Sequence, residues 1–93
     1  MEFEWDEAKS DVCFAQRGFD FVYALQAFID PDRLIRQDRR WDYDEERYQL
    51  LGMIEQWVFF VVYTVRNSVI RIISARRTNQ REVKDYENNT RQG

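Results

Sequence analysis

The sequence predicts a small α+β fold, in which an antiparallel sheet of three to four strands packs with two N-terminal helices and one C-terminal helix. Three observations in the 93-residue chain favour this class. Apolar residues recur at helical spacing over the first 30 residues. β-Branched and aromatic residues dominate 47–75, where short polar turns favour antiparallel pairing of successive strands. At this length we expect one domain, residues 1–93.

The first third of the sequence predicts a short strand and two helices. "FEW" at 3–5 forms the strand, and Asp6 is a suitable N-cap for a helix that Gly18 ends. Asp20 begins the second helix, which Asp30-Pro31 ends. Its apolar stripe consists of Phe21, Ala24, Leu25 and Phe28.

Strand patterns dominate the middle of the chain. The predicted strands are 33–37, 47–54, 57–66 and 69–75, of which 33–37 has the poorest pattern. The acidic stretch 41–46 is a loop, and Glu55-Gln56 and Asn67-Ser68 are two-residue turns. Asn79, with Glu82 three residues later, is typical of a capping box and begins the last helix.

The composition excludes several kinds of chemistry. The chain has no histidine, and Cys13 is its only cysteine, which excludes histidine-dependent triads and argues strongly against a zinc site. No glycine-rich phosphate loop occurs. We interpret "DYDEE" at 42–46 as a solvated loop and Cys13 as a buried apolar residue. We therefore expect no cofactor and no metal.

The chain carries no signal of secretion or membrane insertion. No stretch has the pattern of a signal peptide. The longest apolar run, 57–65, is shorter than the roughly 18–20 residues that span a bilayer. These features predict a cytoplasmic protein that does not contact the membrane.

The net charge of −3 conceals an uneven distribution. Residues 1–63 hold 7 Lys/Arg and 14 Asp/Glu, whereas 64–93 hold 7 Lys/Arg and 3 Asp/Glu. Five arginines and no acid lie within 64–81, which indicates a focused anion site or a patch for an acidic partner. Solvated surface arginines and local ion pairs are the alternative. Phosphate is the anion that best matches the planar guanidinium group.

The run "RIISARR" at 71–77 ends the last predicted strand. Strict alternation places Ile70, Ile72 and Ser74 on one face of that strand, and Arg71, Ile73 and Ala75 on the other. We expect Ile72 in the core, Arg71 on the open face, and Arg76 at the rim beside the last helix.

Four stretches together resemble the BrnT family. They are "FEWDEAKSDVCFAQRGFDF" at 3–21, "VVYTVR" at 61–66, "RIISARR" at 71–77 and "REVKDY" at 81–86. The resemblance implies a RelE-like fold and a ribonuclease toxin of a type II toxin–antitoxin system, which cleaves RNA and arrests growth. It also implies a partner, a BrnA-like ribbon-helix-helix antitoxin, through which alone the chain would contact DNA.

The resemblance implies site residues at the matching positions. The catalytic candidates are Lys9, Arg66, Arg71, Arg76, Glu82 and Tyr86, and the RNA-binding candidates are Trp5, Arg17, Arg77 and Arg81. We expect the RNA 2′-OH to attack the adjacent phosphorus without a metal ion. Lys9 or Glu82 would be the base, the catalytic arginines would hold the phosphate, and Tyr86 or Lys9 would protonate the leaving oxygen.

Two positions depart from the family pattern. Cys13 stands where other members often have asparagine, and Arg17 stands where they often have histidine. Arginine binds phosphate but does not transfer protons. An alternative function is therefore a catalytically degenerate module that docks an antitoxin and tunes promoter repression. Direct DNA binding fits less well, because the sequence predicts no recognition helix and the chain is acidic.

Overall fold

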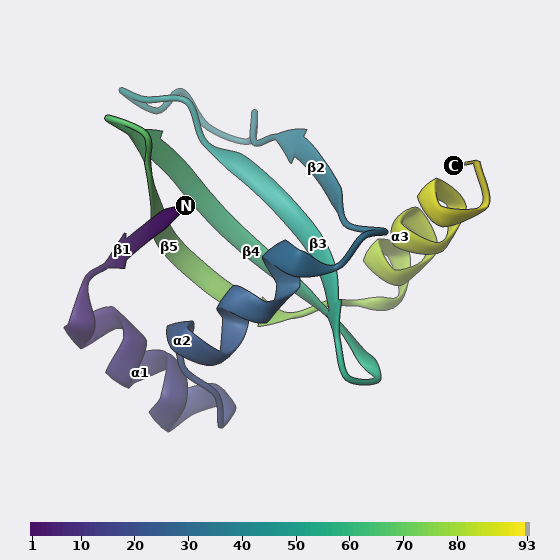
Figure 1. Cartoon of the computed structure of the whole chain (residues 1–93), viewed down its shortest axis with the longest axis horizontal. Coiled ribbons are helices and arrows are strands. Elements are labelled where there is room, and N and C mark those ends of the chain that lie inside the picture. The colour runs from purple at the N-terminus through teal and green to yellow at the C-terminus, as the bar shows by residue number, and fades with distance from the viewer. Residues whose placement is uncertain (93) are drawn as a thin grey trace.

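The computed structural model describes residues 1–92, and Gly93 of the predicted domain lies outside them. The elements form a sheet with helices on both faces (Figure 1). In chain order they are β1 (Glu2–Trp5), α1 (Glu7–Arg17), α2 (Phe21–Ala24), the 3-10 helix η1 (Leu25–Ile29), β2 (Leu34–Gln37), β3 (Tyr48–Ile54), β4 (Trp57–Arg66), β5 (Val69–Arg77) and α3 (Gln80–Gln92).

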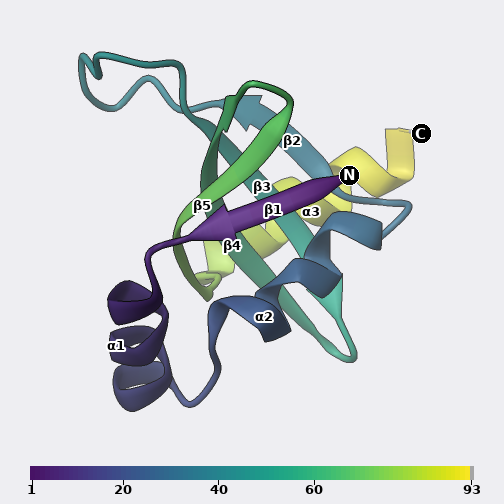
Figure 2. The same cartoon turned by 60° about the vertical axis from the view of Figure 1, so that its left-hand side comes forward.

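The sheet has five strands in the order β1-β5-β4-β3-β2, and it is mixed because β1 runs parallel to β5. The predicted RelE-like sheet of three to four antiparallel strands is therefore wrong. The strands β1 and β2, of four residues each, extend the sheet at its two edges. No hairpin connects β1 to β5, so chain connectivity does not force them to be antiparallel. Figure 2 shows β1 lying along β5 with α1 just beyond its end.

The helices before β2 also differ from the prediction of two regular N-terminal helices. The first is confirmed, because the Asp6 side chain accepts a hydrogen bond from the Ala8 backbone N–H at 2.9 Å and Gly18 ends the helix with φ of 84°. The second is one α-helical turn, α2, that continues as η1. This segment packs closely on β3, because a Cβ added at Gly52 would lie 2.4 Å from the Ala27 carbonyl oxygen. The bare α-carbon of Gly52 is what permits this contact.

A β-bulge in β5 changes the predicted faces of that strand. Tyr63 pairs with Ile72 and Val62 pairs with Ser74, so Ile73 is an extra residue. Ala75 therefore joins Ile70 and Ile72 on the sheet face that α1 covers, contrary to the predicted alternation. Arg71 and Arg76 pair with Thr64 and Phe60, which lie on the opposite face.

Two apolar clusters occupy the two faces of the sheet. The larger lies under α1, α2 and η1 and includes Phe21, Val61 and Ile72. The smaller lies on the opposite face, where Tyr86 of α3 packs with Phe60 and other residues. The strand β4 contributes to both clusters, as expected for a central strand.

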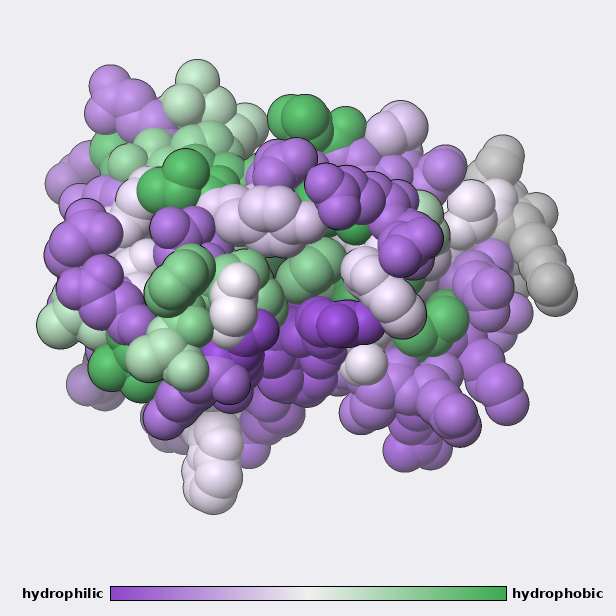
Figure 3. Space-filling view, turned by 90° about the horizontal axis from the view of Figure 1, so that it is seen from below, coloured by the Kyte–Doolittle hydropathy of each residue, from purple (hydrophilic) through white to green (hydrophobic). Residues whose placement is uncertain are grey.

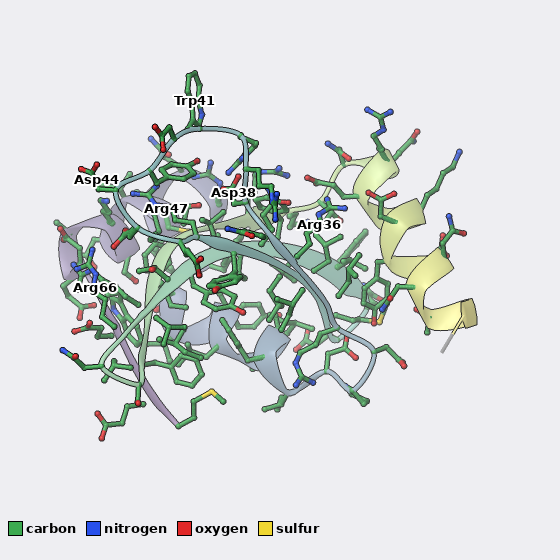
Figure 4. The ribbon with its side chains drawn as sticks, turned by 90° about the horizontal axis from the view of Figure 1, so that it is seen from above. Arg36, Asp38, Trp41, Asp44, Arg47 and Arg66 are labelled. Atoms are coloured by element: carbon green, nitrogen blue, oxygen red, sulfur yellow. The ribbon has the colours of Figure 1, made fainter. Side chains whose placement is uncertain are left out.

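The segment 38–47 forms a loop between β2 and β3. Trp41 stands at its tip, 75% exposed, and points away from the body of the protein (Figure 4). The surface over α1 and α2 mixes apolar and hydrophilic areas, whereas that over α3 is mainly hydrophilic (Figure 3). Among the described residues, no helix is long and apolar enough to cross a membrane.

Candidate functional site

A pocket of about 460 Å³ lies along the edge of β5 that β1 leaves open. The strand β1 pairs only with Val69–Ile72, so beyond that point α1 flanks β5 instead of a strand. The Cys13 thiol lies 3.6 Å from the Ala75 carbonyl oxygen and hydrogen bonds to it across this gap. Because the pocket follows an open edge, it receives side chains from both faces of the sheet.

Four cationic side chains line the pocket: Lys9, Arg17, Arg40 and Arg76. The first two come from α1, Arg40 comes from the 38–47 loop, and Arg76 comes from the end of β5. None of the described residues that line the pocket is Asp or Glu. In a chain of net charge −3, this convergence makes a local site suited to an anion.

Arg76 is held in position by a carboxylate and an aromatic ring. Its Nη1 and Nη2 donate to the two carboxylate oxygens of Glu82, at 2.9 and 2.8 Å. Its guanidinium carbon lies 4.1 Å from the centre of the Phe60 ring. Burial alone would raise the pKa of Glu82, but the hydrogen bonds from Arg76 and from the Asn79 backbone outweigh it and lower the pKa. Glu82 is therefore an ionised partner of Arg76 at neutral pH.

Glu82 also begins α3, as the predicted capping box requires. The Glu82 backbone N–H donates to the Asn79 side-chain oxygen, and the Asn79 backbone N–H donates to Glu82, both at 2.9 Å. This reciprocal pair fixes the first turn of the helix. The carboxylate that orients Arg76 is thus part of a rigid helix start.

Cys13 lines the same pocket from α1 and is buried, as predicted. Burial raises the pKa of its thiol, so Cys13 stays protonated at neutral pH. Its contact with the Ala75 carbonyl makes it a packing residue between helix and strand.

The family of ribonuclease toxins described as BrnT, of type II toxin–antitoxin systems, matches residues 5–82. The chain belongs to the BrnT family. The pocket lies wholly within the matched residues of this BrnT protein, whereas Tyr86 lies beyond them. None of the curated proteins compared with the chain matches it significantly. Membership implies an antitoxin partner.

The structure brings together four of the site residues that the sequence predicts for this BrnT protein. Lys9, Arg17 and Arg76 line the pocket, and Glu82 binds Arg76 directly. The bulge in β5 contributes to this arrangement, because it keeps Arg76 on the face of Phe60 while Ala75 packs under α1.

Two of the predicted arginines lie outside the pocket, each beside an acid. Arg66 donates to Glu45 at 2.6 and 3.0 Å, at the end of the BrnT sheet far from α3 (Figure 4). Arg71 forms a 3.7 Å ion pair with Glu4 of β1.

Tyr86 connects α3 to the turn after η1, where its hydroxyl donates to Asp30 at 2.5 Å. Burial, together with this hydrogen bond, raises the pKa of Tyr86 well above its ordinary value. The Tyr86 side chain lines a different pocket, between α3 and the β3–β4 hairpin. Its hydroxyl therefore has a structural partner at a distance from the cationic pocket.

The remaining predicted RNA-binding residues are dispersed. Arg77 lies over the Trp57 ring at 3.9 Å, and Arg81 is exposed on α3. The Trp5 indole N–H donates to Glu7 at 3.3 Å. These side chains do not line the cationic pocket of the BrnT protein.

Arg40 is the pocket cation that the sequence did not predict. Its neighbour Arg39 is chemically identical, and both lie near the start of the 38–47 loop, so composition alone cannot tell which one turns inward. The only local signal is Asp38, whose carboxylate binds Arg40 at 2.7 and 2.9 Å.

Proposed function

We propose that the chain is a metal-independent ribonuclease toxin whose cationic pocket binds the scissile phosphate of RNA. The observation that carries this proposal is the convergence of Lys9, Arg17 and Arg76 on one pocket of an acidic protein that belongs to the BrnT family. Guanidinium groups pair with phosphate oxygens in a fixed two-point geometry and keep their charge at any physiological pH. Such groups stabilise the negative charge that develops on phosphorus during transfer.

Lys9 is the proton-transfer residue in this proposal. Of the four cations that line the pocket, only lysine can release and regain a proton, because arginine stays protonated in proteins. The RNA O2′ forms a bond to phosphorus as the bond from phosphorus to O5′ breaks. Lys9 takes the 2′-OH proton as the neutral amine and, as the resulting ammonium, gives that proton to O5′, which leaves a 2′,3′-cyclic phosphate and a 5′-OH.

Arg76 and Arg17 hold the phosphate, and Glu82 positions Arg76. Both carboxylate oxygens of Glu82 are engaged by the Arg76 guanidinium, which supports a positioning role. Tyr86 takes no part in this reaction, because its hydroxyl is bound to Asp30 and lies outside the pocket.

The test is cleavage of a mixed-sequence RNA by the purified protein freed of antitoxin. Lys9→Met should lower the rate by about 100-fold or more, the usual range for a lost proton-transfer group. Lys84→Met is the matched control, since Lys84 is an exposed lysine on α3 and lies outside the pocket. A chelator should have no effect. Equal rates for the two variants would contradict the role of Lys9.

A second candidate function is a degenerate module that binds an antitoxin without cleaving RNA. The observation that favours it is Arg17, which lines the pocket where other family members often carry histidine and which cannot transfer a proton. Induction in a bacterial host without the antitoxin distinguishes the two functions. Growth arrest supports the enzyme, and normal growth with retained antitoxin binding supports the module.

We propose a BrnA-like ribbon-helix-helix protein as the antitoxin, and DNA contact only through it. Exposed apolar side chains on α1 and α2, which include Val12, Phe14 and Val22, support a protein partner on these helices. Figure 3 shows apolar areas among hydrophilic ones over the same two helices. Co-expression with the neighbouring reading frame, followed by size exclusion, tests the pair. Two separate peaks at micromolar concentration would contradict it.

A further inference from the structure

We propose that Arg40 is a second phosphate-binding arginine that acts with Arg76 in the pocket beside the ring of Phe60. This inference rests on the proposed RNA-cleaving function and adds a residue from a loop that the sequence assigned no role. Arg40 lines the same pocket as Arg76, although the two are 36 positions apart in the chain. The ligand would be a phosphodiester of the RNA backbone.

The position of Arg40 is fixed by the buried carboxylate of Asp38. Arg40 Nε and Nη2 donate to the two oxygens of Asp38 at 2.9 and 2.7 Å, and the Arg40 backbone N–H donates to the same carboxylate at 3.2 Å. The Asp38 side chain is fully buried, whereas that of Arg40 is half exposed. The hydrogen bonds from Arg40 lower the pKa of Asp38 to about 2. Asp38 thus stays ionised and holds one side of the guanidinium.

The base of the 38–47 loop is itself anchored to the sheet. The Asp38 backbone N–H donates to the Arg47 carbonyl at 2.7 Å, and the Tyr43 hydroxyl lies 3.4 Å from the Asp38 carboxylate. Figure 4 shows Asp38 near the base of the loop and Trp41 far out at its tip. Arg40 therefore extends from the anchored part of the loop.

Arg40 and Arg76 are held in the same way. Each guanidinium is bound at two points by a buried carboxylate, Asp38 or Glu82, and each lies near the Phe60 ring, at 5.6 Å for Arg40 and 4.1 Å for Arg76. The bonds to Asp38 leave Arg40 Nη1 without a partner among residues 1–92. Arg76 donates from Nη1 and Nη2 to Glu82 and from Nη1 also to the Arg77 carbonyl, which leaves its Nε without a partner among the same residues. Two guanidiniums that each keep an unused N–H group match the several oxygens of a phosphodiester.

The paired carboxylates of Asp38 and Glu82 also explain how Arg40 and Arg76 can line one pocket despite their like charge. Arg40 and Arg76 would repel each other if both were bare, and each carboxylate offsets one charge. A phosphodiester that enters the pocket finds donors already oriented, so little ordering is needed when it binds. Arg40 is a binding residue in this scheme, and Asp38 is a positioning residue.

The test measures binding of a 2′-O-methyl RNA oligonucleotide, which cannot be cleaved because its 2′ oxygen is blocked. Arg40→Gln should weaken binding about 10-fold, as expected for a lost charged hydrogen bond. It should also reduce the slope of log affinity against log salt by about 0.7, the value for one phosphate contact to a single strand. Arg39→Gln is the matched control, because Arg39 is the exposed neighbour and contacts Gln37. Arg39→Gln should change the affinity by less than about twofold and leave the salt slope as in wild type.

Two further variants separate phosphate binding from loop folding. Arg40→Lys keeps the charge but loses the two-point hold, so binding should weaken while the salt slope is retained. Asp38→Asn should weaken binding in the wild-type background but not in Arg40→Gln, because Asp38 acts through Arg40. Additive effects of the two changes would show that Asp38 only supports the fold.

The outcomes distinguish this inference from the function on which it rests. If wild type binds and cleaves RNA but Arg40→Gln behaves like Arg39→Gln, the role of Arg40 is wrong and the proposed function survives. If wild type neither binds nor cleaves RNA, both are overturned. Weakened binding with a reduced salt slope in Arg40→Gln alone supports the two-arginine site.

Discussion

Arg76 of β5 and Glu82 of α3 form a two-point ion pair, with nitrogen–oxygen distances of 2.9 and 2.8 Å. The same carboxylate accepts the Asn79 backbone N–H that begins α3. The Glu82 side chain therefore connects the end of β5 to the start of α3 and also orients the pocket residue Arg76. Changes at this pair should affect both the stability of the fold and the proposed activity.

Arg76→Gln should lower RNA cleavage about 100- to 1000-fold, because a donor aimed at the developing phosphate charge is lost. It should also destabilise the fold by about 1–3 kcal/mol, since the buried carboxylate of Glu82 loses its charged partner. Arg77→Gln is the control, because Arg77 is exposed and lies over Trp57 outside the cationic pocket. Cleavage assays and thermal melts measure the two effects. An Arg76→Gln variant with full activity would exclude Arg76 from the site.

Acid should destabilise the protein through Asp38 and Glu82. The pKa of Asp38 falls to about 2 from an ordinary 3.8, and the pKa of Glu82 falls below its ordinary 4.5. Because these groups take up protons more readily in the unfolded chain, their stabilisation is complete above about pH 5 and is lost as the pH falls toward 2. Asp38 should account for about 1–2 kcal/mol of the loss, because the half-exposed Arg40 is screened by solvent.

Urea unfolding between pH 7 and pH 2.5 measures this loss. Asp38→Asn should be less stable than wild type at pH 7 and should lose less of its stability on acidification. If the two proteins show the same pH dependence, the Asp38–Arg40 pair contributes nothing to stability.

Val61→Asp should unfold the protein or nearly so. Val61 is 0% exposed in the larger apolar cluster, and burial of an unpaired carboxylate there costs several kcal/mol against a typical total of about 5–15. Val65→Asp, on the same face of β4 but 50% exposed, should be mild. Circular dichroism melts compare the two. Similar melting temperatures would mean that the register of β4 is misassigned.

Gly52→Ala should destabilise the fold by about 1–3 kcal/mol, the usual cost of overpacking. The added methyl would lie 2.4 Å from the Ala27 carbonyl oxygen and 2.9 Å from the Ala27 Cβ, so η1 must move away from β3. Gly18→Ala provides a contrast, because nothing lies within 4 Å of its added Cβ and only the backbone strain of φ 84° remains. Chemical denaturation of the two variants compares the cost of overpacking at Gly52 with the cost of backbone strain at Gly18. If Gly52→Ala were as stable as wild type, η1 would not be in close contact with β3.

Local chemistry predicted much of the fold. The caps at Asp6, Gly18 and Asn79 and the turn at Asn67-Ser68 depend on neighbouring residues, and both turn residues have the positive φ that a tight hairpin requires. The parallel pairing of β1 with β5 joins segments more than 60 residues apart, and nothing in "FEW" indicates which strand it pairs with. The sequence carries no signal for the bulge at Ile73 either, because isoleucine and serine are ordinary residues in regular strands.

The candidate site was predictable to a similar degree. The family motifs identified Lys9, Arg17, Arg76 and Glu82, and the structure brings these together. The same motifs included Arg66 and Arg71, which lie outside the pocket. Arg66 pairs with Glu45 of the loop and Arg71 pairs with Glu4 of β1, and the sequence predicted neither contact. Arg40 could not be predicted, because its position in the pocket depends on the ion pair with Asp38. The burial of Asp38 results from the folding of the whole loop and cannot be seen in the local sequence.

The extra residue in β5 bears on how sequences of this family are aligned. Arg71 and Arg76 are five positions apart, an odd number that a regular strand would place on opposite sides. Deletion of Ile73 alone would restore regular pairing and leave the number of arginines unchanged, yet one of the two guanidinium groups would have to change sides. A relative that lacks one residue here should therefore carry only one of these two arginines on the sheet face of Phe60.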